Sequence, residues 1–411
     1  MPGGIVGDEA RERPQAWIVA MPRPEPVTSD PESRVWGLTA AERVRRSLLR
    51  AGVVRIESCE VGEHRPEASG TCLVLRDDLF YDERILAGLL DAQDVVLHHA
   101  LAPDAPEPVA AMCEAARLSE VTAALRDRRE STPEGLHSKG ILDLASAYNR
   151  ALRKFDPPFV IPARDTTLDL AEVENQLFAA SYKGITDLVT KWVFPLPARA
   201  TVRVLAGWGV RPNTVTAFSY VLAVAVTFLF AEGWLALGLL LGWLMTFLDT
   251  VDGKLARCTL TSSRFGNVFD HALDLVHPPI WWAAWAMALP GGIADHQVSF
   301  WLVIGGYLVG RLLEGTFSLA FGIAMFVWRP FDGFFRAVIA RRNPNLLLLS
   351  GSLLLGDPTL GFQAVAAWTG TCIVVEAIRN LQALIESWRG VEIRSWLDDR
   401  DPSEGVEKAR S

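Results

Sequence analysis

The sequence lacks several features that mark common classes of protein. Only five of its 411 residues are cysteine, and none has CxxC spacing, which predicts neither a disulfide framework nor a zinc site. The net charge of −8 excludes the basic excess of a general nucleic-acid binder. The N-terminus, MPGGIVGDEARERPQAW, lacks the apolar core of a cleavable signal peptide, so we expect the N-terminal part to be cytoplasmic.

The chain divides near Leu170 into two parts of unlike composition. Half of all residues are hydrophobic and 21% are charged, but the first part mixes the two kinds as a soluble domain does, whereas the second contains long apolar runs. We therefore expect an α-helical integral membrane protein with an N-terminal cytoplasmic α/β domain.

Six apolar runs in the second part can be compared with the roughly 20 residues that span a bilayer. The segments that connect them alternate between segments that contain Lys or Arg and segments that contain neither. This alternation predicts six transmembrane helices, with both termini cytoplasmic, in a multi-pass protein of the inner or cell membrane. The runs are 212–231, 234–248, 275–294, 297–328, 343–356 and 358–375.

Four aspartates stand between the second and third runs, in FLDTVDGKLARCTLTSSRFGNVFDHALDL. Asp249 and Asp252 are spaced i, i+3, and Gly266, Asp270 and Asp274 are spaced i, i+4, i+8, so each group lies on one face of a helix. A carboxylate at the bilayer centre costs roughly 3 kcal/mol, so the group needs cationic partners. Oxygen ligands suit Mg²⁺, Mn²⁺ or Ca²⁺, and a carboxylate-bound metal pair suits a diphosphate.

The same stretch reads D-x-x-D-G-x-x-A-R, eight residues, then G-x-x-x-D-x-x-x-D. It resembles the signature of the CDP-alcohol phosphatidyltransferases, as does RPNTVT at 211–216, and the resemblance covers roughly residues 170–388. It implies a homodimeric membrane enzyme in which an acceptor alcohol attacks the phosphorus of a CDP-alcohol, such as CDP-diacylglycerol, and CMP leaves. The acceptor would be a lipid or a polyol.

The resemblance also implies roles for individual residues. Two divalent cations, Mg²⁺ or Mn²⁺, would be bound by the four aspartates, and Asp274 would also be the general base. The residues implied for the metals are Asp249, Asp252, Asp270 and Asp274, and those implied for CDP are Gly253, Ala256, Arg257, Gly266, Asn213 and Thr216.

Four arginines in or after the fourth run suit a phosphate group on the acceptor. They are Arg311, Arg336, Arg341 and Arg342. For Arg311 the alternative is a structural ion pair with Glu314, and for the other three it is a role as positive-inside anchors. For the whole chain, the alternatives are a solvated acidic loop at the aspartates, or a divalent-cation or solute transporter with an intramembrane acidic site.

The N-terminal part alternates short apolar segments with amphipathic ones, which predicts an α/β domain with a largely parallel sheet. We expect strands at 16–20, 53–57, 72–76 and 95–98 and helices at 39–52 and 82–92. The arrangement resembles a sugar-phosphate nucleotidyltransferase, as found in bifunctional inositol-phosphate cytidylyltransferase fusions. Asp77 and Asp78 lie where a metal-binding acidic residue could be, but the first strand is not followed by a Gly-rich phosphate loop. We therefore interpret the domain as degenerate, with a regulatory, docking or structural role, and the alternative is an active cytidylyltransferase.

The predicted domain organisation has four parts. They are the α/β domain at 1–165, a linker with interfacial amphipathic helices at 166–211, the six-span phosphotransferase domain at 212–388, and a polar tail at 389–411. The linker helices are expected at 171–192 and 198–208, and the alternative for the first is an ordinary linker helix packed on the soluble domain.

Overall fold

A computed structural model describes most of the chain, which divides into two compact units. The described residues are 14–22, 34–59, 68–102, 105–128, 132–144, 158–163, 170–182, 184–262 and 264–397, with side chains except at 102, 105, 170, 172 and 264–273. The first unit comprises Met1–Tyr148 and Asp156–Leu177, and the second comprises Asn149–Phe155 and Phe178–Ser411.

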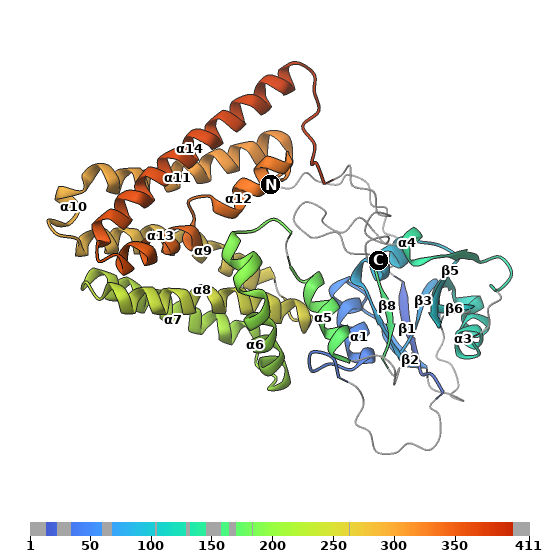
Figure 1. The fold of residues 1–411 in the computed structure, drawn as a ribbon. Helices are drawn as coiled ribbons and strands as arrows, with labels where there is room; N and C mark the ends of the chain where they lie inside the picture. The colour runs from blue at the N-terminus through green and yellow to red at the C-terminus, as the bar shows by residue number, and fades with distance from the viewer. Residues whose placement is uncertain are drawn as a thin grey trace. The chain divides into compact units, whose positions relative to one another are not determined.

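The first unit is built on a six-stranded sheet with the strand order β2-β1-β3-β6-β5-β7 (Figure 1). Strand β1 is parallel to β2 and β3, and β5 is parallel to β7, whereas β6 runs antiparallel to both of its neighbours. A separate ribbon pairs β4 with β8. The strands are β1 (Gln15–Val19), β2 (Ile56–Cys59), β3 (Thr71–Arg76), β4 (Leu79–Tyr81), β5 (Val95–Ala102), β6 (Ala105–Glu114), β7 (His137–Lys139) and β8 (Val160–Pro162).

The sheet is mixed rather than largely parallel because β6 follows β5 as an antiparallel partner. Its sequence begins with APEP, and proline cannot donate to a strand ladder. Strand β3 pairs with β6 along Ala110–Glu114, so Pro106 and Pro108 lie beyond that pairing and face β5 across an irregular register. Because proline is unusual within strands, the sequence analysis did not predict β6.

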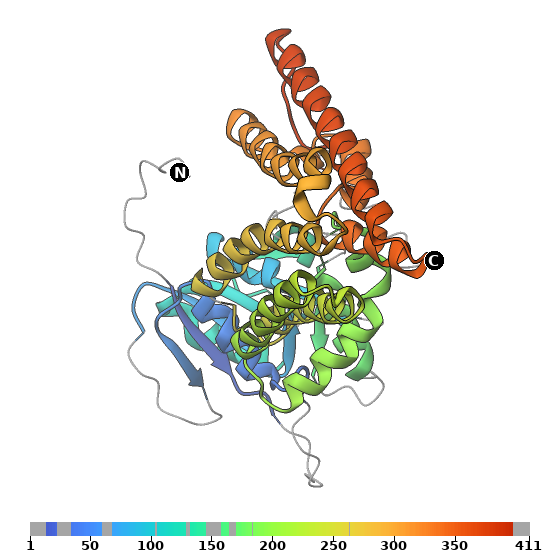
Figure 2. The same ribbon diagram turned by 90° about the vertical axis from the view of Figure 1, so that its left-hand side faces the viewer.

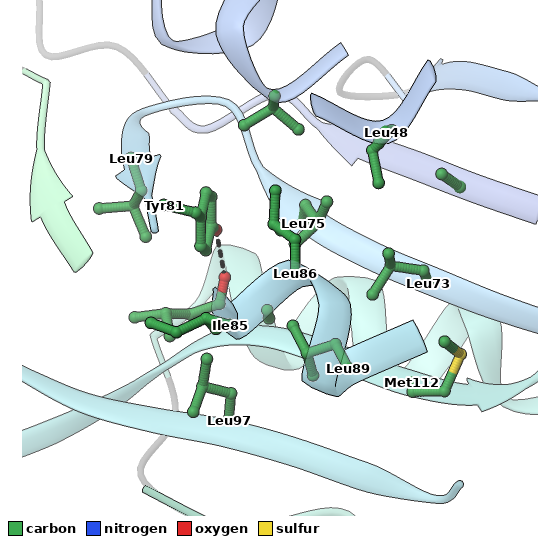
Figure 3. Close-up of a cluster of buried hydrophobic side chains, with 14 of the residues drawn as sticks. Leu48, Leu73, Leu75, Leu79, Tyr81, Ile85, Leu86, Leu89, Leu97 and Met112 are labelled. Atoms are coloured by element: carbon green, nitrogen blue, oxygen red, sulfur yellow. Dashed lines mark hydrogen bonds between the residues drawn. The ribbon is translucent and has the colours of Figure 1, made fainter. Parts of the chain in front are cut away.

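Helices cover the sheet and supply much of its core. They are α1 (Ala40–Arg50), α2 (Glu83–Asp91), the 3₁₀ turn η1 (Ala115–Arg117), α3 (Leu118–Arg126) and α4 (Ile141–Leu144). A capping box between Thr39 and Glu42 begins α1. Figure 3 shows Leu48 of α1 and Leu89 of α2 beside Leu73 of β3, all fully buried. Helices α1 and α2 lie within the segments predicted to be helical, and these apolar contacts pack them against the sheet.

The second unit is helical. Helix α5 (Leu170–Ala180) ends just inside it, and the remaining elements are η2 (Val189–Val193, a π-helical turn), α6 (Pro195–Gly207), α7 (Pro212–Ala231), α8 (Leu235–Cys258), α9 (Arg264–Ala288), α10 (Gly292–Asp295), α11 (Gln297–Phe321), η3 (Met325–Val327), α12 (Pro330–Val338), α13 (Arg342–Leu354) and α14 (Pro358–Trp388). Helix α7 packs along α8, and α11 packs along α14 (Figures 1 and 2).

Within the described residues, four helices are long and apolar enough to cross a membrane: α7, α8, α11 and α14. Together with outward-facing apolar side chains such as Phe228, Leu240 and Leu312, each 65–67% exposed, they indicate an integral membrane protein. All six predicted runs overlap helices, although the runs 275–294 and 297–328 extend beyond the ends of α9 and α11. Helix α13 has only 13 residues, or about 20 Å, against a hydrocarbon core of about 30 Å. Six crossings and cytoplasmic termini therefore stay predictions.

A cluster of aromatic side chains joins α9 to α7 inside this unit. Trp281, Trp282 and Trp285 of α9 are at most 1% exposed, and the Trp281 indole N–H donates to the backbone oxygen of Ala223 at 2.9 Å. Phe230 of α7 packs edge-to-face on Trp281 and Trp285. Because this cluster holds α9 against α7, the aspartates of α8 and α9 are carried on a packed framework.

The linker differs from the two continuous amphipathic helices predicted at 171–192 and 198–208. Its first segment is broken after α5 and resumes as the π-helical turn η2, and Gly184 lies in the break. Around the start and end of α6, Trp192, Leu196 and Trp208 are 63–75% exposed. Exposed tryptophans beside a membrane domain suit the interface, as predicted for this segment.

Candidate active site

Two of the predicted metal-binding aspartates lie one turn apart in the C-terminal half of α8. Asp252 is buried and accepts a hydrogen bond from Thr216 Oγ1 of α7 at 2.6 Å. The structure thus brings together a residue predicted to bind metal and one predicted to bind CDP. Asn213 lies exposed on the first turn of the same helix α7.

Arg342, the first residue of α13, connects the other two described carboxylates. Its Nη2 donates to Asp249 Oδ2 at 2.5 Å and its Nη1 donates to Asp274 Oδ1 at 2.7 Å. The Asp249 side chain is 16% exposed, and that of Asp274 is 45% exposed. One guanidinium group therefore joins α8, α9 and α13 at the acidic site.

Asp270 and Gly266 lie in α9, but their side-chain environments fall outside the described residues. Among the side chains that are described, no three His, Cys, Asp or Glu residues converge as a metal site. The donor set nevertheless fits divalent cations, because it offers only carboxylate oxygens and because Asp249 and Asp274 already share a cationic group.

The other residues predicted to bind CDP follow Asp252 on α8. A Cβ atom at Gly253 would lie 3.1 Å from Arg257 Nη2, so glycine leaves room for that guanidinium group. Ala256 is half-buried on the same helix. Lys254 turns elsewhere: its ammonium group donates to the Ser181 backbone oxygen at 3.0 Å and lies 3.1 Å from the centre of the Tyr182 ring.

A pocket of about 510 Å³ opens beside Asp274. Its lining contains all four arginines that the sequence singled out, although they come from α11, α12, α13 and the α12–α13 connection. They are Arg311, Arg336, Arg341 and Arg342. Asp274 and Asp187 also line it, so the pocket combines guanidinium groups with one wall of the acidic site.

The four guanidinium groups differ in their partners. Arg342 is paired with aspartates, as described above, and Arg311 and Arg341 both donate to Glu314. Arg336 Nη1 is buried and has no hydrogen-bond partner within the described part of the chain. Burial and the nearby positive charge of Arg341 lower the pKa of Arg336 to about 9. An anion in the pocket would relieve both effects.

Asp187 and Asn343 form a polar contact that sequence reasoning missed. Asn343 Nδ2 donates to Asp187 Oδ1 at 2.9 Å, and Asn343 Oδ1 accepts from Thr246 Oγ1 at 2.7 Å. Burial raises the pKa of the Asp187 carboxyl group, but hydrogen bonds from Thr190 and Asn343 outweigh this and hold its pKa below the usual range. The only sequence signal was the polar pair of asparagines at the start of an apolar run, Asn343 and Asn345.

The first unit also places acidic residues beside an arginine, after β3. Arg76 is 1% exposed and donates to both carboxylate oxygens of Asp78 at 2.9 Å and to Glu107 Oε2 at 2.8 Å. Asp77 Oδ1 accepts the backbone N–H of Met21 at 3.0 Å. The carboxylates that could bind a metal in a nucleotidyltransferase-like domain are therefore held by groups of the chain itself.

Comparisons with known proteins agree with the resemblance seen in the motif. The family model described as CDP-alcohol phosphatidyltransferase matches residues 209–333. An archaetidylinositol phosphate synthase of Pyrococcus horikoshii is 31% identical over 134 residues, which are 31% of this chain and 69% of that protein. A bifunctional IPC transferase and DIPP synthase of Rubrobacter xylanophilus is 31% identical over 223 residues, covering 54% of this chain and 48% of the relative, so this chain spans about half of that protein.

Two solved structures of a phosphatidylinositol phosphate synthase from Mycobacterium tuberculosis are also similar. The one with bound CDP-DAG is 21% identical and covers 52% of this chain and 98% of its own, with a TM-score of 0.33. The one with manganese and citrate is 22% identical and covers 50% and 91%, with a TM-score of 0.32. On the strength of the family model and the archaeal relative, the chain belongs to the CDP-alcohol phosphatidyltransferase family.

Proposed function

We propose that this membrane transferase moves a substituted phosphate from a CDP-alcohol to a hydroxyl group of an acceptor that itself carries a phosphate. The observation that carries this proposal is the pocket beside Asp274, in which Arg336 Nη1 lacks a hydrogen-bond partner among the described residues. Guanidinium groups bind phosphate oxygens in a bidentate manner, and an unpaired buried one is costly. A neutral acceptor alcohol would leave that cost in place.

The chain's own residues divide the reaction between them. Asp274 lies between the acidic site and the pocket, so it is placed to accept the proton of the acceptor hydroxyl as the new phosphodiester bond forms. Two divalent cations, Mg²⁺ or Mn²⁺, would neutralise the diphosphate and the departing CMP. The residues that would hold them are Asp249, Asp252, Asp270 and Asp274.

The CDP group would bind along α7 and α8, on the side of Asp252 that faces Thr216. The hydrogen bond between these two residues fixes the carboxylate relative to the first turns of α7. The remaining residues proposed to bind CDP are Asn213, Gly253, Ala256, Arg257 and Gly266.

The names of the relatives suggest which acceptor to test first. The Pyrococcus protein is an archaetidylinositol phosphate synthase and the Mycobacterium protein a phosphatidylinositol phosphate synthase. Inositol phosphate is a phosphorylated polyol, as the arginine pocket requires. The family relationship favours this transferase over the transporter alternative.

The test uses the full chain in detergent with CDP-diacylglycerol and Mg²⁺. CMP release is measured with inositol phosphate and glycerol phosphate, and with unphosphorylated inositol and glycerol. We expect release only with the phosphorylated acceptors. Equal rates with the unphosphorylated compounds would exclude a phosphate-binding acceptor pocket, and metal transport without CMP release would support the transporter.

For the first unit we propose a structural or docking role rather than cytidylyltransferase activity. This is supported by Arg76, which already occupies the carboxylates of Asp78 and Glu107. The full chain incubated with CTP and a polyol phosphate should release no pyrophosphate, and release would show that the domain is active. Homodimer formation and cytoplasmic termini complete the proposal and can be examined by cross-linking and by cysteine accessibility in vesicles.

A further inference from the structure

Behind the arginine pocket lies an acidic pair to which the proposed reaction assigns no role. Glu314 belongs to α11 and Glu376 to α14, and Glu376 is 2% exposed. Both line a small cavity of about 20 Å³, together with Arg311 and Arg341. Carboxyl groups within membrane-spanning helices are costly and usually functional, so the pair needs an explanation.

Arg311 and Arg341 lie between this small cavity and the arginine pocket, because both residues line both spaces. On the cavity side, Arg311 Nη2 donates to Glu314 Oε1 at 3.0 Å, and Arg341 Nη2 donates to Glu314 Oε2. Glu314 itself is not among the described residues that line the pocket. A guanidinium group is planar with five N–H donors in fixed directions, so holding one edge determines where the others point.

Aromatic rings restrict the same two side chains. The Arg311 guanidinium lies 5.6 Å from the Tyr307 ring centre, and that of Arg341 lies 5.3 Å from the Phe326 ring centre. Tyr307 is itself fixed, because its hydroxyl donates to the Leu275 backbone oxygen at 2.9 Å. Each arginine is thus held by a ring and by Glu314, and its remaining donors are available to the pocket.

Glu376 lies close to α11 beside Glu314. Gly310, one turn before Glu314, leaves the space for it, since a Cβ atom there would lie 3.0 Å from Glu376 Oε2. Gly310, Glu314 and Glu376 line the same small cavity, so Glu376 packs against the face of α11 that carries Glu314.

We propose that Glu314 is a positioning residue for acceptor binding, which orients Arg311 and Arg341 toward the acceptor phosphate while Glu376 holds it in place. This inference rests on the proposed function, because it takes the arginine pocket as the phosphate site. It resolves the two interpretations of Arg311 drawn from the sequence: the ion pair with Glu314 is what makes Arg311 a phosphate ligand.

The test is the variant Glu314→Asp, which keeps the charge but is one methylene shorter, so a single carboxylate no longer reaches both arginines. Inorganic phosphate is titrated calorimetrically into the full chain in detergent. We expect the phosphate Kd and the acceptor KM to rise about 10-fold, the loss of one charge-assisted contact, while the KM of the CDP-alcohol changes less than about twofold. A general structural defect would alter both KM values.

The matched control is Glu386→Asp, the same shortening in an ion pair with Arg329 on the same helix as Glu376, outside the arginine pocket. Its phosphate Kd should equal that of the native chain. An unchanged phosphate Kd in folded Glu314→Asp overturns the inference. If the native chain binds no phosphate, the proposed acceptor pocket fails instead, so the two failures are distinguishable.

A second pair of variants covers the case in which Glu314→Asp does not fold. Glu376→Asp withdraws the carboxyl group that packs beside Glu314 and should raise the phosphate Kd about threefold, because Glu314 is then held less firmly. Glu376→Gln keeps the length of the side chain and its packing against Gly310, so its effect should be smaller. Equal Kd values for the two variants, or a native Kd in both, overturn the inference.

Discussion

Both units of this protein place arginine against aspartate and glutamate, but the two clusters leave their guanidinium groups in opposite conditions. In the first unit, Arg76 is enclosed and donates to Asp78, Glu107 and the Pro108 backbone oxygen. In the second, the Arg336 side chain is only partly buried, and its buried Nη1 has no hydrogen-bond partner among the described residues. The difference separates a guanidinium whose partners belong to the fold from one that we propose binds a ligand.

The largest expected effect belongs to the second cluster, where Asp274 stands at the edge of the pocket. Asp274→Asn should lower the rate of CMP release about 10³-fold, because the amide cannot accept the acceptor proton and is a weaker metal ligand. The measurement is CMP release under saturating substrates, with circular dichroism to verify folding. Retention of more than a tenth of the native rate would remove Asp274 from its proposed role.

The first cluster should respond in stability rather than activity. Arg76→Met leaves two largely buried carboxylates without their buried partner and with only the exposed Arg128 nearby, which should destabilise the first unit by about 3 kcal/mol. Urea unfolding followed by tryptophan fluorescence tests this, since Trp17 is buried in the same unit. The acceptor KM of the folded variant should be native, and a raised KM would mean that the closed cluster also serves the reaction.

In the second cluster, Arg336→Gln should affect activity rather than stability. Removing a guanidinium whose Nη1 has no hydrogen-bond partner among the described residues should cost little stability. It should raise the acceptor KM about 10- to 100-fold, as expected for charge-assisted hydrogen bonds to phosphate. Steady-state kinetics with a varied phosphorylated acceptor measures the effect, and Arg329→Gln is the matched control because Arg329 pairs with Glu386 outside the pocket. Equal acceptor KM values in Arg336→Gln and Arg329→Gln would show that Arg336 does not bind the acceptor phosphate.

The smallest effect is expected for Arg128, which is 55% exposed and 3.5–3.7 Å from the same carboxylates as Arg76. Exposed ion pairs contribute about 0–1 kcal/mol, so Arg128→Gln should change the stability of the first unit by less than about 0.5 kcal/mol. The same urea experiment applies. A loss of stability as large as that of Arg76→Met would show that distance from the carboxylates, and not burial of the arginine, determines how much each ion pair stabilises the first unit.

The sequence predicted those features that depend on local pattern. The apolar runs gave the positions of α7, α8, α9, α11, α13 and α14, and the motif around Asp249 and Asp274 predicted the family, which the comparisons confirm. Hydrophobic alternation located β1, β2, β3, β5, α1 and α2 to within a few residues. Periodicity and spacing are local quantities, so a single sequence is sufficient to read them.

The sequence could not supply contacts between distant segments. Glu314 looked like the partner of Arg311 alone, because they are three residues apart, whereas Arg341 reaches it from another element. Asp187 and Asn343 are 156 residues apart in the sequence, and no local pattern predicts that they are hydrogen-bonded. Strand β6 was missed for a different reason, since its two prolines contradict ordinary strand composition.

Arg342 has a consequence for how the two substrates can be studied. Its guanidinium contacts Asp249 and Asp274 and also lines the arginine pocket, so one side chain borders both of the proposed binding regions. We expect a substitution at this position to affect the binding of both substrates. Kinetic constants for donor and acceptor should therefore change together in any Arg342 variant, and only paired substitutions analysed as a thermodynamic cycle will separate its two contributions.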